Sequence, residues 1–231
     1  MLTAPQFSPE RLAAVLARIE AAARRAGRDP AGIRLLAVSK QQPVAAIAAA
    51  ADAGQREFGE NYVREGVAKV EALRDRSLTW HYIGQLQANK TREVAEHFQW
   101  VHTVDRERVA TRLDGQRPHY AAPLEVLLQV RLGEEPGKGG VEPADLPRLA
   151  EFVAALPRLR LRGLMCIPPP ATDESAQRVP FAQLRRLLEE LNARGHSLDT
   201  LSMGMSADLE AAVLEGATLL RIGTAVFGPR N

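Results

Sequence analysis

The sequence predicts an α/β protein, a single (β/α)8 TIM barrel with an extra N-terminal helix. Strand-like and helix-like segments alternate along the chain until eight strands have appeared. Eight strand–helix units with right-handed crossovers favour a closed barrel. No linker or change in composition divides the chain, so we expect one domain over residues 1–231. The alternative is a doubly wound open sheet, but no Gly-x-Gly-x-x-Gly motif follows the first strand.

The first helix is marked by its boundary residues. Ser8 suits the N-cap of a helix over residues 8–26, Pro9 suits its first position, and Gly27 follows as a stop. Residues 33–39 form the most apolar run in this part of the chain, which indicates a buried first strand.

Later segments are bounded by residues that end helices and strands. Gly54 closes the second helix, Gly195 closes the longest one, and Pro168–Pro170 breaks the chain after the sixth strand. The expected strands, in chain order, are 33–39, 57–61, 79–84, 100–104, 124–132, 160–167, 199–202 and 217–223. The helices expected after the first seven of them are 43–53, 62–74, 87–97, 106–114, 143–155, 174–194 and 207–215.

Composition limits the classes of partner. Of the 231 residues, 45% are hydrophobic and 25% are charged, which is typical of soluble globular proteins. A net charge of +2 gives no reason to expect a nucleic acid or a membrane as partner. The single cysteine, Cys166, excludes a disulfide within the chain, and no signal-peptide pattern opens it, so we expect a cytoplasmic protein.

A lysine and two small-residue strand ends suggest a covalently held, phosphorylated cofactor. Lys40 ends the first strand, Ser206 follows the seventh, and Gly223 and Thr224 follow the eighth. These strands are neighbours in a closed barrel, and their carboxyl ends form its active face. A lysine in a desolvated site can form a Schiff base with a carbonyl group. Hydroxyl and backbone N–H groups at a helix start suit a phosphate. Further candidates by position are Asn61, His81, Ile83 and Met165.

Several candidates also have plainer interpretations. Ser206 can be the N-cap of the helix after the seventh strand, with Asp208 in its first turn. Arg221 can form a structural pair with Glu60. His81 can be a hydrogen-bonded strand residue with no part in chemistry.

Five short segments carry a resemblance to a known family. They are AVSK at 37–40, FGENY at 58–62, WHYIGQLQANK at 80–90, SMGMSAD at 202–208 and RIGTAVFG at 221–228. Together they resemble the pyridoxal phosphate homeostasis proteins, which are similar to the N-terminal barrel of alanine racemase. The resemblance runs from about residue 8 to the end, and several motifs in one order make it specific.

The resemblance implies pyridoxal 5′-phosphate as cofactor, held as a Schiff base by Lys40. It implies that Ser206, Gly223 and Thr224 hold the phosphate and that Arg221 faces the pyridine nitrogen. Asn61 would lie near the ring, with Met165 and Met203 lining the pocket. Together with the candidates by position, the expected cofactor-binding residues are Lys40, Asn61, His81, Ile83, Met165, Met203, Ser206, Arg221, Gly223 and Thr224.

An arginine at the pyridine nitrogen favours a carrier over an enzyme. A guanidinium keeps its proton, so the ring nitrogen stays unprotonated and the ring is a weak electron sink. Alanine racemase adds a second domain with a catalytic tyrosine, which we expect to be missing because this chain ends three residues after Gly228. The family is regarded as binding and supplying the cofactor. We therefore expect a monomeric, non-enzymatic carrier that serves apo-enzymes.

Two other functions remain open. One is a racemase or another aldimine enzyme for small substrates, and the other is a barrel that binds a different phosphorylated ligand without a covalent bond. The sequence also departs from the family at two places. Pro136 stands where family members commonly have serine, in the loop 133–138 that also carries Lys138, and Gln41–Gln42 follows Lys40 where Thr-Lys is frequent.

Overall fold

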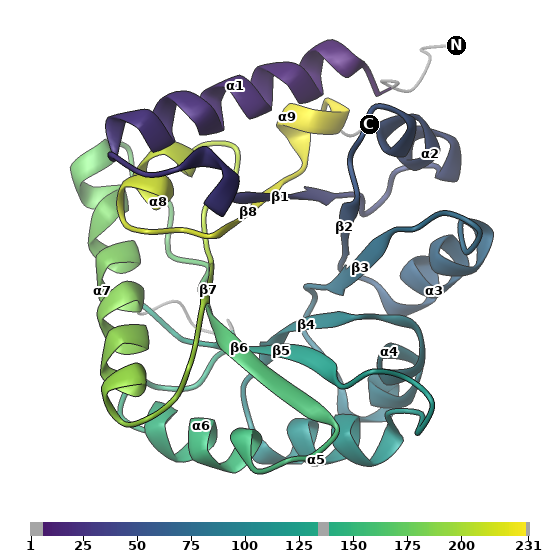
Figure 1. Ribbon diagram of the computed structural model, residues 1–231, viewed down its shortest axis with the longest axis vertical. Helices are drawn as coiled ribbons and strands as arrows, with labels where there is room; N and C mark the ends of the chain where they lie inside the picture. Colours follow the sequence, from purple (N-terminus) through teal and green to yellow (C-terminus); the bar gives the residue numbers. More distant parts are fainter. Residues whose placement is uncertain (1–6, 134–138, 230–231) are drawn as a thin grey trace.

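Eight parallel strands form a closed barrel in the computed structural model, which describes residues 7–133 and 139–229. Each strand pairs with the next, and β8 pairs with β1. Figure 1 shows the ring of strands with the helices arranged around its outside. The predicted barrel is confirmed, and the open sheet was the wrong alternative.

The strands follow the predicted order along the chain. They are β1 (Arg34–Val38), β2 (Glu57–Glu60), β3 (Thr79–Tyr82), β4 (Trp100–Val104), β5 (Leu124–Gln129), β6 (Leu159–Met165), β7 (Thr200–Ser202) and β8 (Leu219–Ile222). The fifth strand ends before the predicted residue 132. Beyond Gln129, the chain forms a separate bridge between Val130 and Val141.

Along the sequence, the helices alternate with the strands, as predicted. They are α1 (Pro9–Arg25), α2 (Val44–Asp52), α3 (Val63–Ala72), α4 (Thr91–His97), α5 (Glu107–Gln116), α6 (Leu146–Ala154), α7 (Glu174–Ala193), α8 (Leu209–Leu214) and α9 (Thr224–Phe227), with short 3-10 turns η1 (Pro30–Gly32) and η2 (Ala88–Lys90). The sequence did not predict α9, because a single helical turn leaves no periodic pattern to detect.

The extra helix α1 packs on the outside of the barrel against α8 and α9 (Figure 1). Ser8 caps it as predicted, since its side chain accepts a hydrogen bond from the Arg11 backbone N–H. Just after the helix, Arg28 donates to the carbonyl groups of Val213 and Ala217 at 2.7 and 2.8 Å. The helix is thereby tied to the segment that leads into β8.

The main hydrophobic core lies between the strands and the helices, whereas the barrel interior is partly polar. Side chains alternate along a strand, so every second residue points inward. Two small apolar clusters are separate from the main core, one around Leu36, Ile83 and Leu219 and one around Trp100, Leu127 and Met165. The buried polar residues of the strands include His81, His102, Ser202 and Arg221.

Candidate cofactor site

A cavity of about 260 Å³ lies where β1, β2, β3 and β8 end. It is lined by Val38, Lys40, Asn61, Ile83, Ile167, Met205, Ser206, Ala207, Arg221, Gly223 and Thr224. Seven of the ten residues expected from the sequence are therefore brought together. Leu36 of β1 pairs with Arg221 of β8, which explains how residues so far apart in sequence meet here.

The other three expected residues lie elsewhere. His81 is fully buried in the barrel interior, where its Nδ1 lies 2.9 Å from Nε2 of His102. Met165 packs against Trp100 and Leu127. Met203 belongs to the main core. None of the three lines the cavity.

Other residues line the wall in place of the two methionines. Ile167 lies two residues beyond Met165, and Met205 lies two residues beyond Met203. Gly204 turns the chain between the two late methionines with a φ of +89°. A Cβ at this glycine would lie 2.6 Å from the Cβ of Ala212, so only glycine allows this bend against α8.

Lys40 stands in a turn that is held on both sides. The preceding carbonyl, of Ser39, accepts a hydrogen bond from Lys69 Nζ at 2.7 Å. The following backbone N–H, of Gln41, donates to Glu65 Oε1 at 2.5 Å. Gln41 has a φ of +61°, a conformation that is uncommon for a residue with a side chain. These contacts fix the backbone from which the Lys40 side chain reaches the cavity.

Lys69 links the two sides of this turn and was missed from the sequence. Its ammonium donates to Ser39 O, to Glu60 Oε1 at 2.9 Å and to Glu65 Oε1 at 2.6 Å, so all three of its protons have acceptors. Glu60 is fully buried, and burial raises the pKa of its carboxyl group although the Lys69 charge opposes the shift. The suggested pair between Arg221 and Glu60 is wrong, because Lys69 is the cation beside Glu60.

Arg221 projects from β8 into the site with its guanidinium anchored at two nitrogens. Nη1 donates to Ser202 Oγ and Nη2 donates to the Cys166 carbonyl, both at 2.8 Å. Burial lowers the pKa of Arg221 from its usual value, but a guanidinium remains protonated in proteins. Burial also raises the pKa of the Cys166 thiol to about 12, so this cysteine is a neutral core residue.

Ser206 lines the cavity but does not cap the next helix. That helix, α8, begins at Leu209 with Asp208 at its N-cap position, and no side-chain capping bond is formed there. Instead, Asp208 Oδ1 accepts a hydrogen bond from the Met205 backbone N–H at 2.6 Å and closes the turn that carries Ser206. The predicted cap was wrong because this turn adds residues before the helix starts.

The outer helix α1 supports the Ser206 turn. Arg18 donates to the Ser206 carbonyl at 3.1 Å and forms a two-pronged contact with Glu210, at 2.9 Å to each carboxylate oxygen. Nothing in the local sequence of Arg18 indicated this contact. The other two residues expected at the phosphate come after β8, where Gly223 precedes the first turn of α9 and Thr224 begins it.

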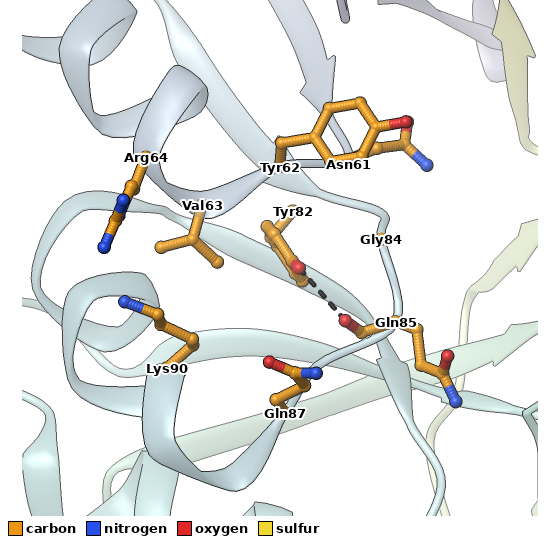
Figure 2. A pocket seen from close by; sticks show the side chains of 9 residues that line it. All are labelled: Asn61, Tyr62, Val63, Arg64, Tyr82, Gly84, Gln85, Gln87 and Lys90. Atoms are coloured by element: carbon orange, nitrogen blue, oxygen red, sulfur yellow. Dashed lines mark hydrogen bonds between the residues drawn. The ribbon is translucent and has the colours of Figure 1, made fainter.

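A second cavity, of about 470 Å³, adjoins the first and shares Asn61 with it (Figure 2). Arg64 and Lys90 lie on one side of it, and the hydroxyl of Tyr82 donates to the Gln85 carbonyl at 3.2 Å. Burial raises the pKa of Tyr82 to about 12, so this tyrosine stays protonated. Lys90 forms an ion pair with Glu93 at 2.8 Å. Lys138 and Pro136 lie outside the described residues.

The described residues hold no group of three or more His, Cys, Asp or Glu side chains suited to a metal ion. Among the helices of residues 7–133 and 139–229, none has the length and apolar character to cross a membrane.

Known proteins with curated functions resemble this chain along almost its whole length. The pyridoxal phosphate homeostasis protein of Pseudomonas aeruginosa is 58% identical over 222 residues, which cover 96% of this chain and 95% of its own. The protein of the same name from Escherichia coli K12 is 53% identical over 223 residues, with 95% of each chain covered.

Solved structures agree with this relationship. PipY of Synechococcus elongatus with PLP bound has a TM-score of 0.80 and 42% identity, covering 92% of this chain and 100% of PipY. Alanine racemase from Corynebacterium glutamicum shares the fold alone, with a TM-score of 0.67 and 14% identity over 64% of that enzyme. The model of the alanine racemase N-terminal domain matches residues 11–231. The chain therefore belongs to the alanine racemase N-terminal domain family and, within it, to the pyridoxal phosphate homeostasis proteins.

Proposed function

We propose that this chain binds pyridoxal 5′-phosphate (PLP) through Lys40, and that it buffers the cofactor and delivers it to enzymes that require it. The observation that carries the proposal is one cavity in which Lys40, Arg221 and the hydroxyl-bearing residues Ser206 and Thr224 meet. The names of the relatives and the PLP bound to PipY support the same cofactor.

The donor groups of the cavity fit PLP. Lys40 offers an amine for the aldehyde, and Arg221 offers guanidinium N–H groups to the unprotonated ring nitrogen. Ser206 and Thr224 offer hydroxyl donors to the phosphate. When bound, PLP supplies an electrophilic aldehyde carbon and a ring that accepts electrons.

The surrounding residues hold these groups in place. Lys69 and Glu65 fix the turn that carries Lys40, and Arg18 fixes the turn that carries Ser206. Arg221 donates hydrogen bonds and keeps its own proton, so it does not protonate the ring. A site built this way holds the cofactor firmly while giving little help to carbanion chemistry, which suits a carrier.

The attachment of PLP to Lys40 can be tested directly. The protein incubated with PLP is reduced with borohydride, which converts a C=N bond to a stable amine, and its peptides are mapped. We expect the modification on Lys40 and its loss in Lys40→Ala. Lys90→Ala is the matched control, and a modification that appears only on Lys90 or Lys138 contradicts the proposal.

Delivery is tested with an apo-enzyme. The PLP-loaded protein should restore the activity of a PLP-requiring apo-enzyme, whereas Lys40→Ala carried through the same loading and desalting should not. Incubation with L-alanine or L-serine should give little racemisation or transamination. Sustained turnover that depends on Lys40 would favour a racemase instead. We further propose that the carrier acts as a monomer in the cytoplasm, and sedimentation of the loaded protein checks its mass.

A further inference from the structure

Five polar side chains form a connected line through the barrel interior below the cofactor cavity. From Arg221, the line passes to Ser202, whose Oγ lies 2.9 Å from Nδ1 of His102. Nε2 of His102 lies 2.9 Å from Nδ1 of His81. Nε2 of His81 then lies 3.3 Å from Oε2 of Glu57, in a close contact that is not aligned as a hydrogen bond.

The line crosses the barrel rather than following the sheet. Ser202 ends β7 and His102 lies on β4, and these strands are not neighbours in the barrel order. Both histidine side chains and Ser202 are fully buried. The His81 ring also stacks on Trp100, with ring centroids 5.3 Å apart, which fixes the orientation of the imidazole.

The two ends of the line determine the direction of every hydrogen bond in it. The guanidinium of Arg221 can only donate, and an ionised Glu57 can only accept. Ser202 therefore accepts from Arg221 and donates its own proton to Nδ1 of His102. His102 then carries its proton on Nε2 and donates to Nδ1 of His81. His81 in turn carries its proton on Nε2, facing Glu57.

The reverse direction fails at both ends. A proton on Nδ1 of His102 would leave the Ser202 hydroxyl proton without an acceptor among the described residues, in a fully buried position. It would also turn an unprotonated His81 nitrogen toward the Glu57 carboxylate, so two acceptors would face each other. A buried polar group without a partner is costly.

The charges along the line are consistent with neutral histidines between two ionised ends. Burial lowers the pKa of His81 and lowers that of His102 well below its usual value. Burial alone would raise the pKa of Glu57, but His81 and Arg34 hold it below its usual value. Arg34 Nη1 lies 3.4 Å from Glu57 Oε1, so the carboxylate has a cation beside it.

We propose that His81, His102 and Ser202 are positioning residues that hold the Arg221 guanidinium toward the cofactor ring through this directed chain of hydrogen bonds. That Arg221 faces the cofactor ring rests on the proposed function, whereas the series of hydrogen bonds from Arg221 to His81 does not. Because the Ser202 proton is committed to His102, a lone pair of the Ser202 oxygen stays aimed at Arg221. The position of Arg221 thus depends on residues that do not touch the cofactor.

The tautomers of His81 and His102, measured in the full-length protein without cofactor, test the direction of these hydrogen bonds. Long-range proton–nitrogen NMR spectra at pH 8 should show His81 and His102 protonated on Nε2 and not on Nδ1. His97 is the internal reference for a proton on Nδ1, since its Nδ1 lies 2.9 Å from the Glu93 carbonyl, which can only accept. His81→Gln and His102→Gln assign the signals. A proton on Nδ1 of either buried histidine overturns the proposal.

The positioning role is tested with PLP itself. Ser202→Ala should weaken PLP binding by about tenfold and shift the absorption band of the bound cofactor, because one anchor of Arg221 is lost. Thr91→Val, which removes another buried hydroxyl outside the barrel, should change neither. Unchanged affinity and an unchanged band in Ser202→Ala overturn the positioning role alone. A wild-type protein that binds no PLP overturns the proposed function, and the positioning role with it.

Discussion

Ser206 and Thr224 place two hydroxyl groups in the cofactor cavity, one from the loop that follows β7 and one from the first residue of α9, just after β8. Hydrogen bonds to a charged group contribute about 1.5–3 kcal/mol each. We therefore expect Ser206→Ala or Thr224→Ala to weaken PLP binding roughly 10- to 100-fold. Titration of the protein with PLP, followed by absorbance, measures the effect.

The control for these variants is Thr111→Ala. Thr111 is exposed on α5, and its hydroxyl donates to the Glu107 carbonyl, far along the chain from the cavity residues. It should leave PLP affinity unchanged. If Ser206→Ala and Thr224→Ala both bind PLP as tightly as the wild type, the phosphate lies elsewhere.

At the residue scale, the sequence located those cavity residues that stand at strand ends. Lys40, Gly223 and Thr224 were predictable because the ends of β1 and β8 must meet when the barrel closes. Met205 was not predictable, because the positive φ of Gly204 redirects the chain and moves the contact two residues beyond Met203. Such a bend depends on how closely the chain packs against α8, which no local pattern encodes.

At the scale of the elements, Lys69 joins α3 to the ends of β1 and β2. Its ion pair with Glu60 is buried on both sides, with 6% and 0% of the side chains exposed. Removing one partner of a buried pair costs about 3–5 kcal/mol, because the other charge stays buried without compensation. We expect Lys69→Met to lower the free energy of unfolding by about this amount in urea titrations at pH 7.5.

A double variant separates the lone charge from other effects. Glu60→Gln with Lys69→Met leaves a neutral side chain that can still accept from the Ser39 hydroxyl, so it should recover most of the lost stability. Lys90→Met breaks a more exposed ion pair, with Glu93, and should cost no more than about 1 kcal/mol. A Lys69→Met variant that is as stable as Lys90→Met would contradict the buried-pair account.

The elements themselves were largely predictable, and the contacts between them were not. Strand and helix periods show in any single segment, which is why each strand–helix pair was found. Lys69 lies nine residues beyond Glu60, on a helix whose sequence pattern is that of an ordinary amphipathic helix and does not indicate the ion pair. Arg18 reaches Glu210 from the other end of the chain. Contacts of this kind exist only after the barrel has closed.

At the scale of the whole molecule, the barrel interior departs from the branched apolar filling usual in this fold. A line of polar groups runs from the half-buried Glu57 through the buried His81, His102 and Ser202 to Arg221, between two small apolar clusters. Buried polar groups are tolerated only when they have partners. The protonation states along the line therefore have to be correct, which makes the stability of the fold depend on pH.

This dependence has a definite sign. In the unfolded chain a histidine takes up a proton near pH 6.5. Burial lowers the pKa of His81, and burial together with His81, Arg221 and Arg34 lowers the pKa of His102 well below its usual value. Below about pH 6.5 these two histidines therefore bind more protons in the unfolded chain than in the folded one, and their contribution to the free energy of unfolding falls as the pH falls. Each histidine contributes a slope of up to about 1.4 kcal/mol per pH unit.

Acidic groups act against this trend, so a variant is needed to isolate the histidines. Burial raises the pKa of Glu60 and of Asp208, so on acidification they take up protons first in the folded state, which adds stability.

His102→Gln removes one titrating group and should flatten the decline of unfolding free energy between pH 6.5 and 5 by up to about 1.4 kcal/mol per pH unit, whatever the stability of the variant itself. Thr111→Ala, at an exposed position without a titrating group, should keep the wild-type slope. Equal slopes in His102→Gln and the wild type would mean that His102 takes up its proton to the same extent in the folded and the unfolded chain. That outcome would contradict the neutral His102 required by a Ser202 hydroxyl that donates to its Nδ1.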